Sequence, residues 1–105
     1  MDTFTALADP TRRQIIESLA TGEHSFGALA DRFEMSRPAV SQHLKVLRDA
    51  GIVASRADGQ RRIYQLTSCG LDELDDWLRK VRSYWSKRLD RLEEVLGERD
   101  EGEER

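Results

Sequence analysis

The chain has 105 residues, with 17 basic and 20 acidic side chains and a formal net charge of −3, and its length predicts one domain. Its single cysteine, Cys69, excludes an internal disulfide, and no run approaches the roughly 20 apolar residues of a membrane-spanning helix. The first residues lack the basic start and apolar run of a secretory signal, so we expect a cytoplasmic protein without a membrane partner.

Two helices are expected at the start of the chain. The stretch "MDTFTALA" can form a short helix with Phe4 and Leu7 on one side. In "DPTRRQIIESLATG", Asp9 is placed to cap the next helix and Pro10 to occupy its first position. Gly22 is expected to end this helix, because glycine is common just beyond a helix C-terminus.

The next segments have the pattern of a helix–turn–helix. We expect His24 to lie in a solvent-exposed loop and Ser25 to cap a short third helix. Ser36 then caps a longer helix that runs to about Ala50 and stops at Gly51. Three apolar residues at positions i, i+4 and i+7 would form its inward face: Val40, Leu44 and Leu47.

The outward face of this longer helix carries hydrogen-bonding side chains: Arg37, Ser41, Gln42 and Lys45. A DNA major groove admits one α-helix, and its base edges are read by short polar side chains and by Gln or Arg. We therefore predict that Ser41 and Gln42 read bases and that Arg37 reads a base or binds a phosphate. Lys45, and Ser36 at the helix N-terminus, would bind phosphates. The alternative is an ordinary solvated helix face.

His43 lies between the inward and outward faces of the same helix. In one interpretation it is partly buried, where it packs beside Val40 and Leu47 or bonds to nearby backbone. In the other it contacts a phosphate of bound DNA. The sequence favours neither interpretation over the other.

A basic hairpin is expected after the helix–turn–helix. In "IVASRADGQRRIYQLT", two β-rich runs flank Asp58-Gly59, a strong hairpin signal. Residues 32–62 carry seven basic and three acidic side chains, a net charge of +4 that the total conceals. Arg56, Arg61 and Arg62 would let the hairpin reach the DNA backbone or the minor groove. Alternatively, these arginines only protect the strand edges from aggregation.

A long helix is expected at the end of the chain. Its apolar positions are spaced close to a heptad seam: Leu71, Leu74, Leu78, Val81, Trp85, Leu89, Leu92 and Leu96. So long a seam would be partly exposed unless a second copy covers it. We assign a homodimer interface to part of this helix and to the first helix: Phe4, Leu7, Leu74, Trp77, Leu78, Val81 and Trp85.

The predicted fold is therefore mostly α with a small β-hairpin, a winged helix-turn-helix with a long C-terminal dimerisation helix. Residues 1–97 would form the domain, and the acidic residues 98–105 a disordered tail. Cys69 could be a redox switch, although it is more simply a small residue at a helix start. Trp77, Tyr84 and Trp85 could line an organic-ligand pocket, although core and dimer packing is the simpler role.

The segments "ALADPTRRQIIESL", "FGALADRFEMSRPAVSQHLKVLRDAGIV" and "GQRRIYQL" resemble the ArsR/SmtB family of winged-helix transcriptional repressors. The resemblance covers about residues 4–96, in order. It implies a homodimer that binds a roughly palindromic double-stranded operator, usually in its own promoter or that of a neighbouring operon. The recognition positions of the family fall on the outward face described above together with Ser36 and His43, and its wing on Arg56–Arg62.

This chain departs from the metal-sensing members of that family. Such members usually carry a cysteine pair where this chain reads "SFGALAD", or bind metal through histidines and carboxylates of the last helix. Here Leu71–Leu96 contains no histidine. We therefore expect no metal site and no cofactor, as in the non-metal-sensing branch, and the inducing signal stays open.

Two other classes of function compete with DNA binding. An enzyme is the weakest, because no nucleophile–base set, glycine-rich phosphate loop or paired carboxylate stands out. A protein-interaction module that uses the C-terminal helix is the stronger rival. The salt dependence of binding distinguishes DNA binding from a protein-interaction module. Operator binding weakens steeply as the salt concentration rises, whereas binding through an apolar interface does not.

Overall fold

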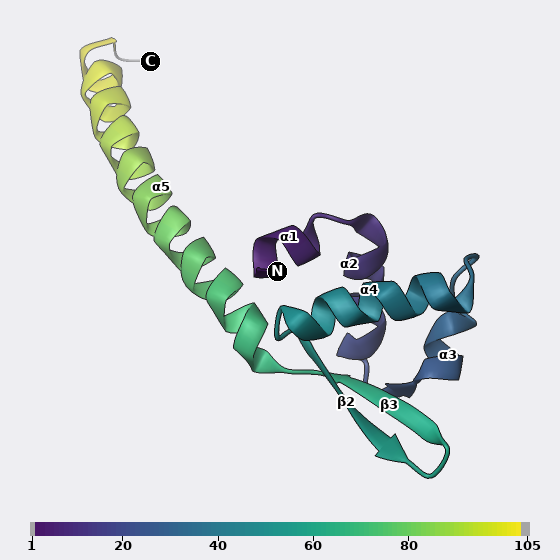
Figure 1. The fold of residues 1–105 in the computed structure, drawn as a ribbon. Coiled ribbons are helices and arrows are strands. Elements are labelled where there is room, and N and C mark those ends of the chain that lie inside the picture. Colours follow the sequence, from purple (N-terminus) through teal and green to yellow (C-terminus); the bar gives the residue numbers. More distant parts are fainter. Residues whose placement is uncertain (1, 104–105) are drawn as a thin grey trace. The chain divides into compact units, whose positions relative to one another are not determined.

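The computed structural model describes residues 2–103, and their side chains as far as Gly97. It is mostly helical with a small antiparallel sheet, as the sequence predicts (Figure 1). The elements are α1 (Thr3–Leu7), α2 (Pro10–Ala20), β1 (His24–Ser25), α3 (Phe26–Ala30), α4 (Arg37–Asp49), β2 (Val53–Asp58), β3 (Arg61–Leu66) and α5 (Ser68–Glu103). The chain forms two units, Met1–Leu74 and Asp75–Arg105.

The predicted capping residues begin the helices of the first unit. The Asp9 carboxylate accepts hydrogen bonds from the backbone N–H groups that open α2, the shorter at 2.7 Å. Ser25 and Ser36 each accept one backbone hydrogen bond at 3.2 Å, at the starts of α3 and α4. Gly51 follows the end of α4 with a φ of 78°, a left-handed conformation that favours glycine.

The sheet has three strands in the order β1-β3-β2, all antiparallel. Asp58 pairs with Arg61, so Gly59 and Gln60 form the turn, one position later than the predicted Asp58-Gly59 pair. Gly59 has a φ of 65°, which the two-residue connection requires.

The sequence did not predict β1, and the expected exposure of His24 is wrong. His24 pairs with Tyr64 of β3 and is half-buried. Its Nε2 atom is buried and has no hydrogen-bond partner among the described residues. A strand of two residues carries no periodic pattern, so its position depends on the β3 edge that it meets.

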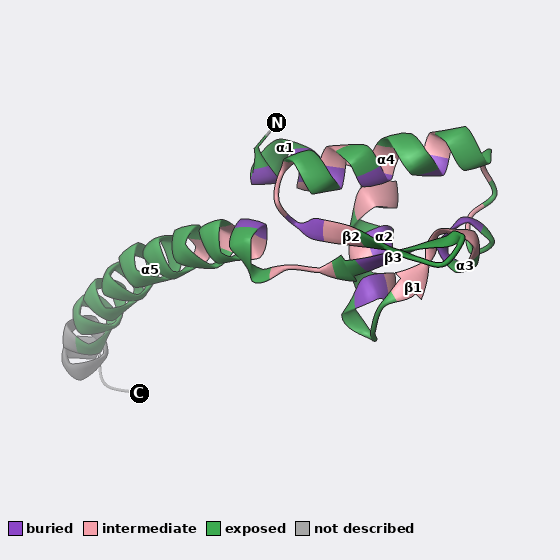
Figure 2. Ribbon diagram, turned by 60° about the horizontal axis from the view of Figure 1, so that its bottom comes forward, coloured by how far each residue is buried: buried purple, intermediate pink, exposed green. Residues whose placement is uncertain are grey.

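The core of the first unit lies where α2, α3, α4 and the hairpin meet, and its largest members are Ile15, Leu29, Val40, Leu44, Leu47 and Ile52. The predicted inward face of α4 is confirmed, because Val40, Leu44 and Leu47 are at most 1% exposed. Figure 2 shows these buried positions on α4 and exposed positions along most of α5.

Helix α5 is the long helix predicted from the heptad pattern. Leu71, Leu74 and Leu78 are half-buried, and the later seam residues from Val81 onward are exposed in the single chain. The helix continues to Glu103, past the expected boundary at Gly97, and residues 104–105 of the predicted tail lie outside the described residues.

Gly70, near the start of α5, packs closely against the end of α4. Its N–H donates to the Gly51 carbonyl at 3.0 Å, just beyond the end of α4. Its own carbonyl accepts a hydrogen bond from the buried hydroxyl of Thr3 in α1 at 3.1 Å. The start of α5 is therefore bonded to both α1 and the end of α4.

We predict that Gly70→Ala destabilises the fold. A Cβ atom there would lie 2.7 Å from Cγ1 of Ile52 and 2.9 Å from the Ala50 carbonyl oxygen. Such overpacking costs about 1–3 kcal/mol, more than the roughly 0.5–1 kcal/mol that Ala gains over Gly in a helix. Urea denaturation should show a lower midpoint for this variant. Gly97→Ala is the control, because no atom lies within 4 Å of its added Cβ. Equal midpoints for both variants would contradict the close approach.

Candidate nucleic-acid interface

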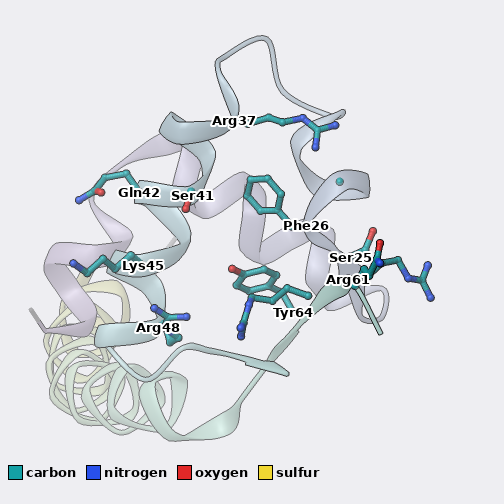
Figure 3. A pocket seen from close by; sticks show the side chains of 12 residues that line it. Ser25, Phe26, Arg37, Ser41, Gln42, Lys45, Arg48, Arg61 and Tyr64 are labelled. Atoms are coloured by element: carbon teal, nitrogen blue, oxygen red, sulfur yellow. The ribbon is translucent and has the colours of Figure 1, made fainter. Parts of the chain in front are cut away.

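An open groove of about 660 Å³ lies between the outward face of α4 and the β2–β3 hairpin, within the first unit (Figure 3). Four elements and the hairpin turn supply its lining: Ser25, Phe26, Gly27, Arg37, Ser41, Gln42, Lys45, Arg48, Gln60, Arg61, Arg62 and Tyr64. The structure thus brings together six of the nine residues predicted to bind DNA. The six are Arg37, Ser41, Gln42, Lys45, Arg61 and Arg62.

Two aromatic rings form the floor of the groove. Phe26 at the start of α3 and Tyr64 of β3 have ring centroids 6.5 Å apart and an interplanar angle of 50°. The Arg37 guanidinium lies 6.0 Å from the Phe26 centroid, in a cation–π arrangement, and 3.4 Å from the Asp31 carboxylate. These contacts hold Arg37 at one edge of the groove. The sequence analysis did not select either ring, because only the fold brings them together.

The α4 side of the groove contains one basic residue that the sequence analysis missed. Arg48 follows Lys45 by three positions and Ser41 by seven, which places all three on one helix face. This spacing alone could have identified Arg48. Gln60 was also missed, because the turn was expected one residue earlier.

Ser36 and His43 lie outside the groove lining. The Ser36 hydroxyl is engaged in capping α4. His43 is half-buried, and its Nδ1 atom lies 3.3 Å from Nη1 of Arg12. Arg12 also donates to the carbonyls of Ala6 at 2.7 Å and Thr5 at 3.2 Å. The position of His43 favours the packing interpretation, although its polar partner is an arginine side chain and not nearby backbone.

Arg56 also lies outside the groove lining. It pairs with Ile63, whereas the next residue of β3, Tyr64, lines the groove, and successive strand residues point to opposite faces of a sheet. Arg56 instead donates two hydrogen bonds to the Glu23 carboxylate, at 2.7 and 3.0 Å. This hydrogen bonding, together with the attraction between the opposite charges, lowers the pKa of Glu23 and raises that of Arg56. The charge of Arg56 is therefore matched within the protein.

The groove lining is strongly basic. It contains five cationic side chains and, among the described residues, no carboxylate: Arg37, Lys45, Arg48, Arg61 and Arg62. A concave basic surface beside an exposed helix face that bears Ser and Gln fits the charge and shape of duplex DNA. Elsewhere in the described part of the chain, no three His, Cys, Asp or Glu side chains gather to hold a metal ion. Within residues 2–103, no helix is long and apolar enough to cross a membrane.

The fold and this groove define a winged helix-turn-helix DNA-binding protein. The model of the arsR family of bacterial regulatory proteins matches residues 9–55. The HTH-type transcriptional regulator Rv2034 of Mycobacterium tuberculosis is 49% identical over 86 residues, which cover 82% of this chain and 78% of that protein. The transcriptional repressor SdpR of Bacillus subtilis is 35% identical, with 71% of this chain and 83% of that protein covered. The chain belongs to the ArsR family of transcriptional regulators.

Solved structures agree with this assignment. The crystal structure of a possible transcriptional regulator for arsenical resistance is 42% identical and has a TM-score of 0.72, with 88% of this chain and 93% of that chain covered. Among the relatives found by sequence, the arsenical resistance operon repressor of Staphylococcus xylosus is 36% identical, with 66% of both chains covered. This is a family of DNA-binding regulators and not of enzymes, and the similarity does not favour the interaction-module alternative.

Proposed function

We propose that this protein represses its own or a neighbouring operon as a homodimer bound to a roughly palindromic operator. The observation that carries the proposal is the basic groove, which combines the polar face of α4 with the hairpin. Helix α4 would lie in the major groove, and Arg61 and Arg62 would contact the backbone or the minor groove. Because its target is genomic DNA, we place the protein in the cytoplasm.

Within α4, the roles follow from side-chain chemistry and position. Ser41 and Gln42 are exposed and line the groove, where a Gln amide can form a bidentate pair with adenine. Lys45 lies one helical turn further along and would bind a phosphate as a point charge. Arg37 would contact a base or a phosphate from its position above Phe26.

We predict that Gln42→Ala relaxes base preference. Losing one bidentate contact costs about 1–3 kcal/mol of discrimination at that base pair. Bound sequences should be selected from a random library of duplex DNA with the wild type and with the variant. Gln65→Ala is the matched control, because Gln65 is exposed on β3 outside the groove lining. An unchanged motif for Gln42→Ala would exclude a reading role for Gln42, and no motif for the wild type would refute the proposed function.

Homodimerisation is supported by the apolar residues that the single chain leaves exposed. In the second unit, 40% of Val81, 57% of Trp85, 42% of Leu89 and about half of Leu92 and Leu96 are accessible. A contiguous exposed strip of this kind marks an interaction surface. Leu74 and Leu78 continue the strip, and Trp77 lies beside it, 48% exposed. We assign Phe4 and Leu7 of α1 to the same interface, as family members typically act as dimers.

We predict that Val81→Glu leaves the chain helical but monomeric. A carboxylate buried without a partner in the interface costs several kcal/mol. The variant should also lose tight operator binding, since one monomer contacts only half of the phosphates. Analytical ultracentrifugation at tens of micromolar, with circular dichroism, measures both properties. Ser83→Glu places the same charge on the other side of the helix and should stay dimeric. A monomeric wild type would overturn the dimer and the palindrome together.

We also propose that metal ions do not regulate this protein, although repressors of metal resistance operons are among its relatives. The chain has one cysteine, and Leu71–Leu96 contains no histidine, so the thiolate and imidazole ligands that zinc-like ions select are too few. Zinc, copper, cadmium and arsenite at micromolar concentrations should therefore leave operator affinity unchanged in gel-shift titrations. A tenfold change that a chelator reverses would contradict this proposal.

A further inference from the structure

Three elements of the first unit meet at the hydroxyl of Ser55, a half-buried residue of β2. The hydroxyl oxygen accepts a hydrogen bond from Nη1 of Arg62 in β3 at 3.1 Å and a longer one from Nη1 of Arg48 in α4 at 3.4 Å. The strand register explains the first contact. Ser55 pairs with Tyr64, and Arg62 lies two positions before Tyr64 on the same face of the hairpin.

Arg48 and Arg62 differ from the neighbouring arginines in how their charge is balanced. Arg37, Arg56 and Arg61 each form an ion pair, with Asp31, Glu23 and Asp58 respectively. Among the described residues, neither Arg48 nor Arg62 has a carboxylate within 4.0 Å. Within that described part of the chain, the only side chain bonded to both is a neutral hydroxyl, whose two lone pairs are then occupied.

Two cations held beside one neutral oxygen form a site for an anion. Each guanidinium has five N–H donors, and the contact with Ser55 uses one of them. The remaining donors suit the two non-bridging oxygens of a phosphodiester, which arginine binds in a planar, bidentate geometry. Both arginines line the basic groove, so the anion would approach from the groove side.

We propose that Arg48 and Arg62 bind one and the same phosphate of the DNA backbone, and that Ser55 is the positioning residue that holds them together. This inference rests on the proposed function and adds to it a shared phosphate contact between α4 and the hairpin. Because Ser55 joins the two elements, it also fixes how far the hairpin lies from the helix that reads bases. One phosphate would thus set the register of both elements on the duplex.

The first test is the salt dependence of binding to the selected operator. Arg48→Ala and Arg62→Ala should each reduce the slope of log affinity against log salt by less than one, because the other arginine still contacts the shared phosphate, and the double variant should reduce it by about one. Arg56→Ala is the matched control and should leave the slope unchanged, because Glu23 already pairs with that arginine. Circular dichroism verifies that each variant is folded. Arg48→Lys and Arg62→Lys should restore the slope but not the full affinity, because lysine lacks the fork geometry.

The variant Ser55→Ala distinguishes the positioning role of the Ser55 hydroxyl from the charge of the two arginines. It keeps both arginines, so the salt slope should stay at the wild-type value while affinity falls by roughly three- to tenfold, the loss expected for one net hydrogen bond. Ser55→Thr keeps a hydroxyl at this strand position and should restore affinity. Wild-type affinity for Ser55→Ala would overturn the positioning role.

The second test asks whether the two arginines share one phosphate. Each phosphate of the operator is replaced in turn by a neutral methylphosphonate. At one position the loss seen with wild type should be smaller in both Arg48→Ala and Arg62→Ala, and it should vanish in the double variant. If the two alanine variants show reduced sensitivity to the methylphosphonate at two different positions, or at none, the shared site is overturned. Operator binding by the wild type, and with it the proposed function, would still stand. A wild type that selects no operator would refute both. Inorganic phosphate at constant ionic strength should not compete, and competition would identify a free-phosphate site instead.

Discussion

The orientation of α4 about its own axis depends on the burial of three side chains. Val40, Leu44 and Leu47 are enclosed by the core, and each fully buried aliphatic side chain contributes about 1.5–3 kcal/mol. Rotating the helix would expose them, so their burial fixes which residues point outward. The polar face is therefore held toward the groove by an apolar constraint on the other side of the same helix. Recognition of DNA needs this fixed orientation, since base edges are read at hydrogen-bond distances.

A second constraint, the two-residue period of the hairpin strands, places Arg56 and Arg62 on opposite faces. Ser55, Arg62 and Tyr64 share the face that lines or adjoins the groove. Arg56 belongs to the opposite face, where Glu23 neutralises it. A shift of β3 by one residue in register would turn Arg62 and Tyr64 away from the face of Ser55 and onto that of Arg56. The turn at Gly59 and Gln60 fixes the register of the two strands. The left-handed backbone conformation of Gly59 therefore helps to keep Arg62, and not Arg56, on the face of Ser55.

Local patterns in the sequence were sufficient for most of the fold. The caps at Asp9, Ser25 and Ser36, the apolar spacing in α4 and the glycine beyond its end each depend on residues close in the chain. The features that were missed depend on distant partners. Strand β1 exists because β3 offers an edge, and Phe26 meets Tyr64 only after folding. The pairing of Arg56 with Glu23 joins residues 33 positions apart, which no local pattern reveals.

The two tryptophans of the chain, Trp77 and Trp85, both belong to the second unit, whereas the groove contains the nearly buried Tyr64. The tryptophan emission of the protein therefore originates in the second unit. Indole emission moves to shorter wavelength when water is excluded, so it would follow association of the long helix. Tyrosine signals do not isolate the hairpin, because the second tyrosine, Tyr84, lies in the second unit and is 64% exposed. Tryptophan emission would thus monitor assembly in one unlabelled sample.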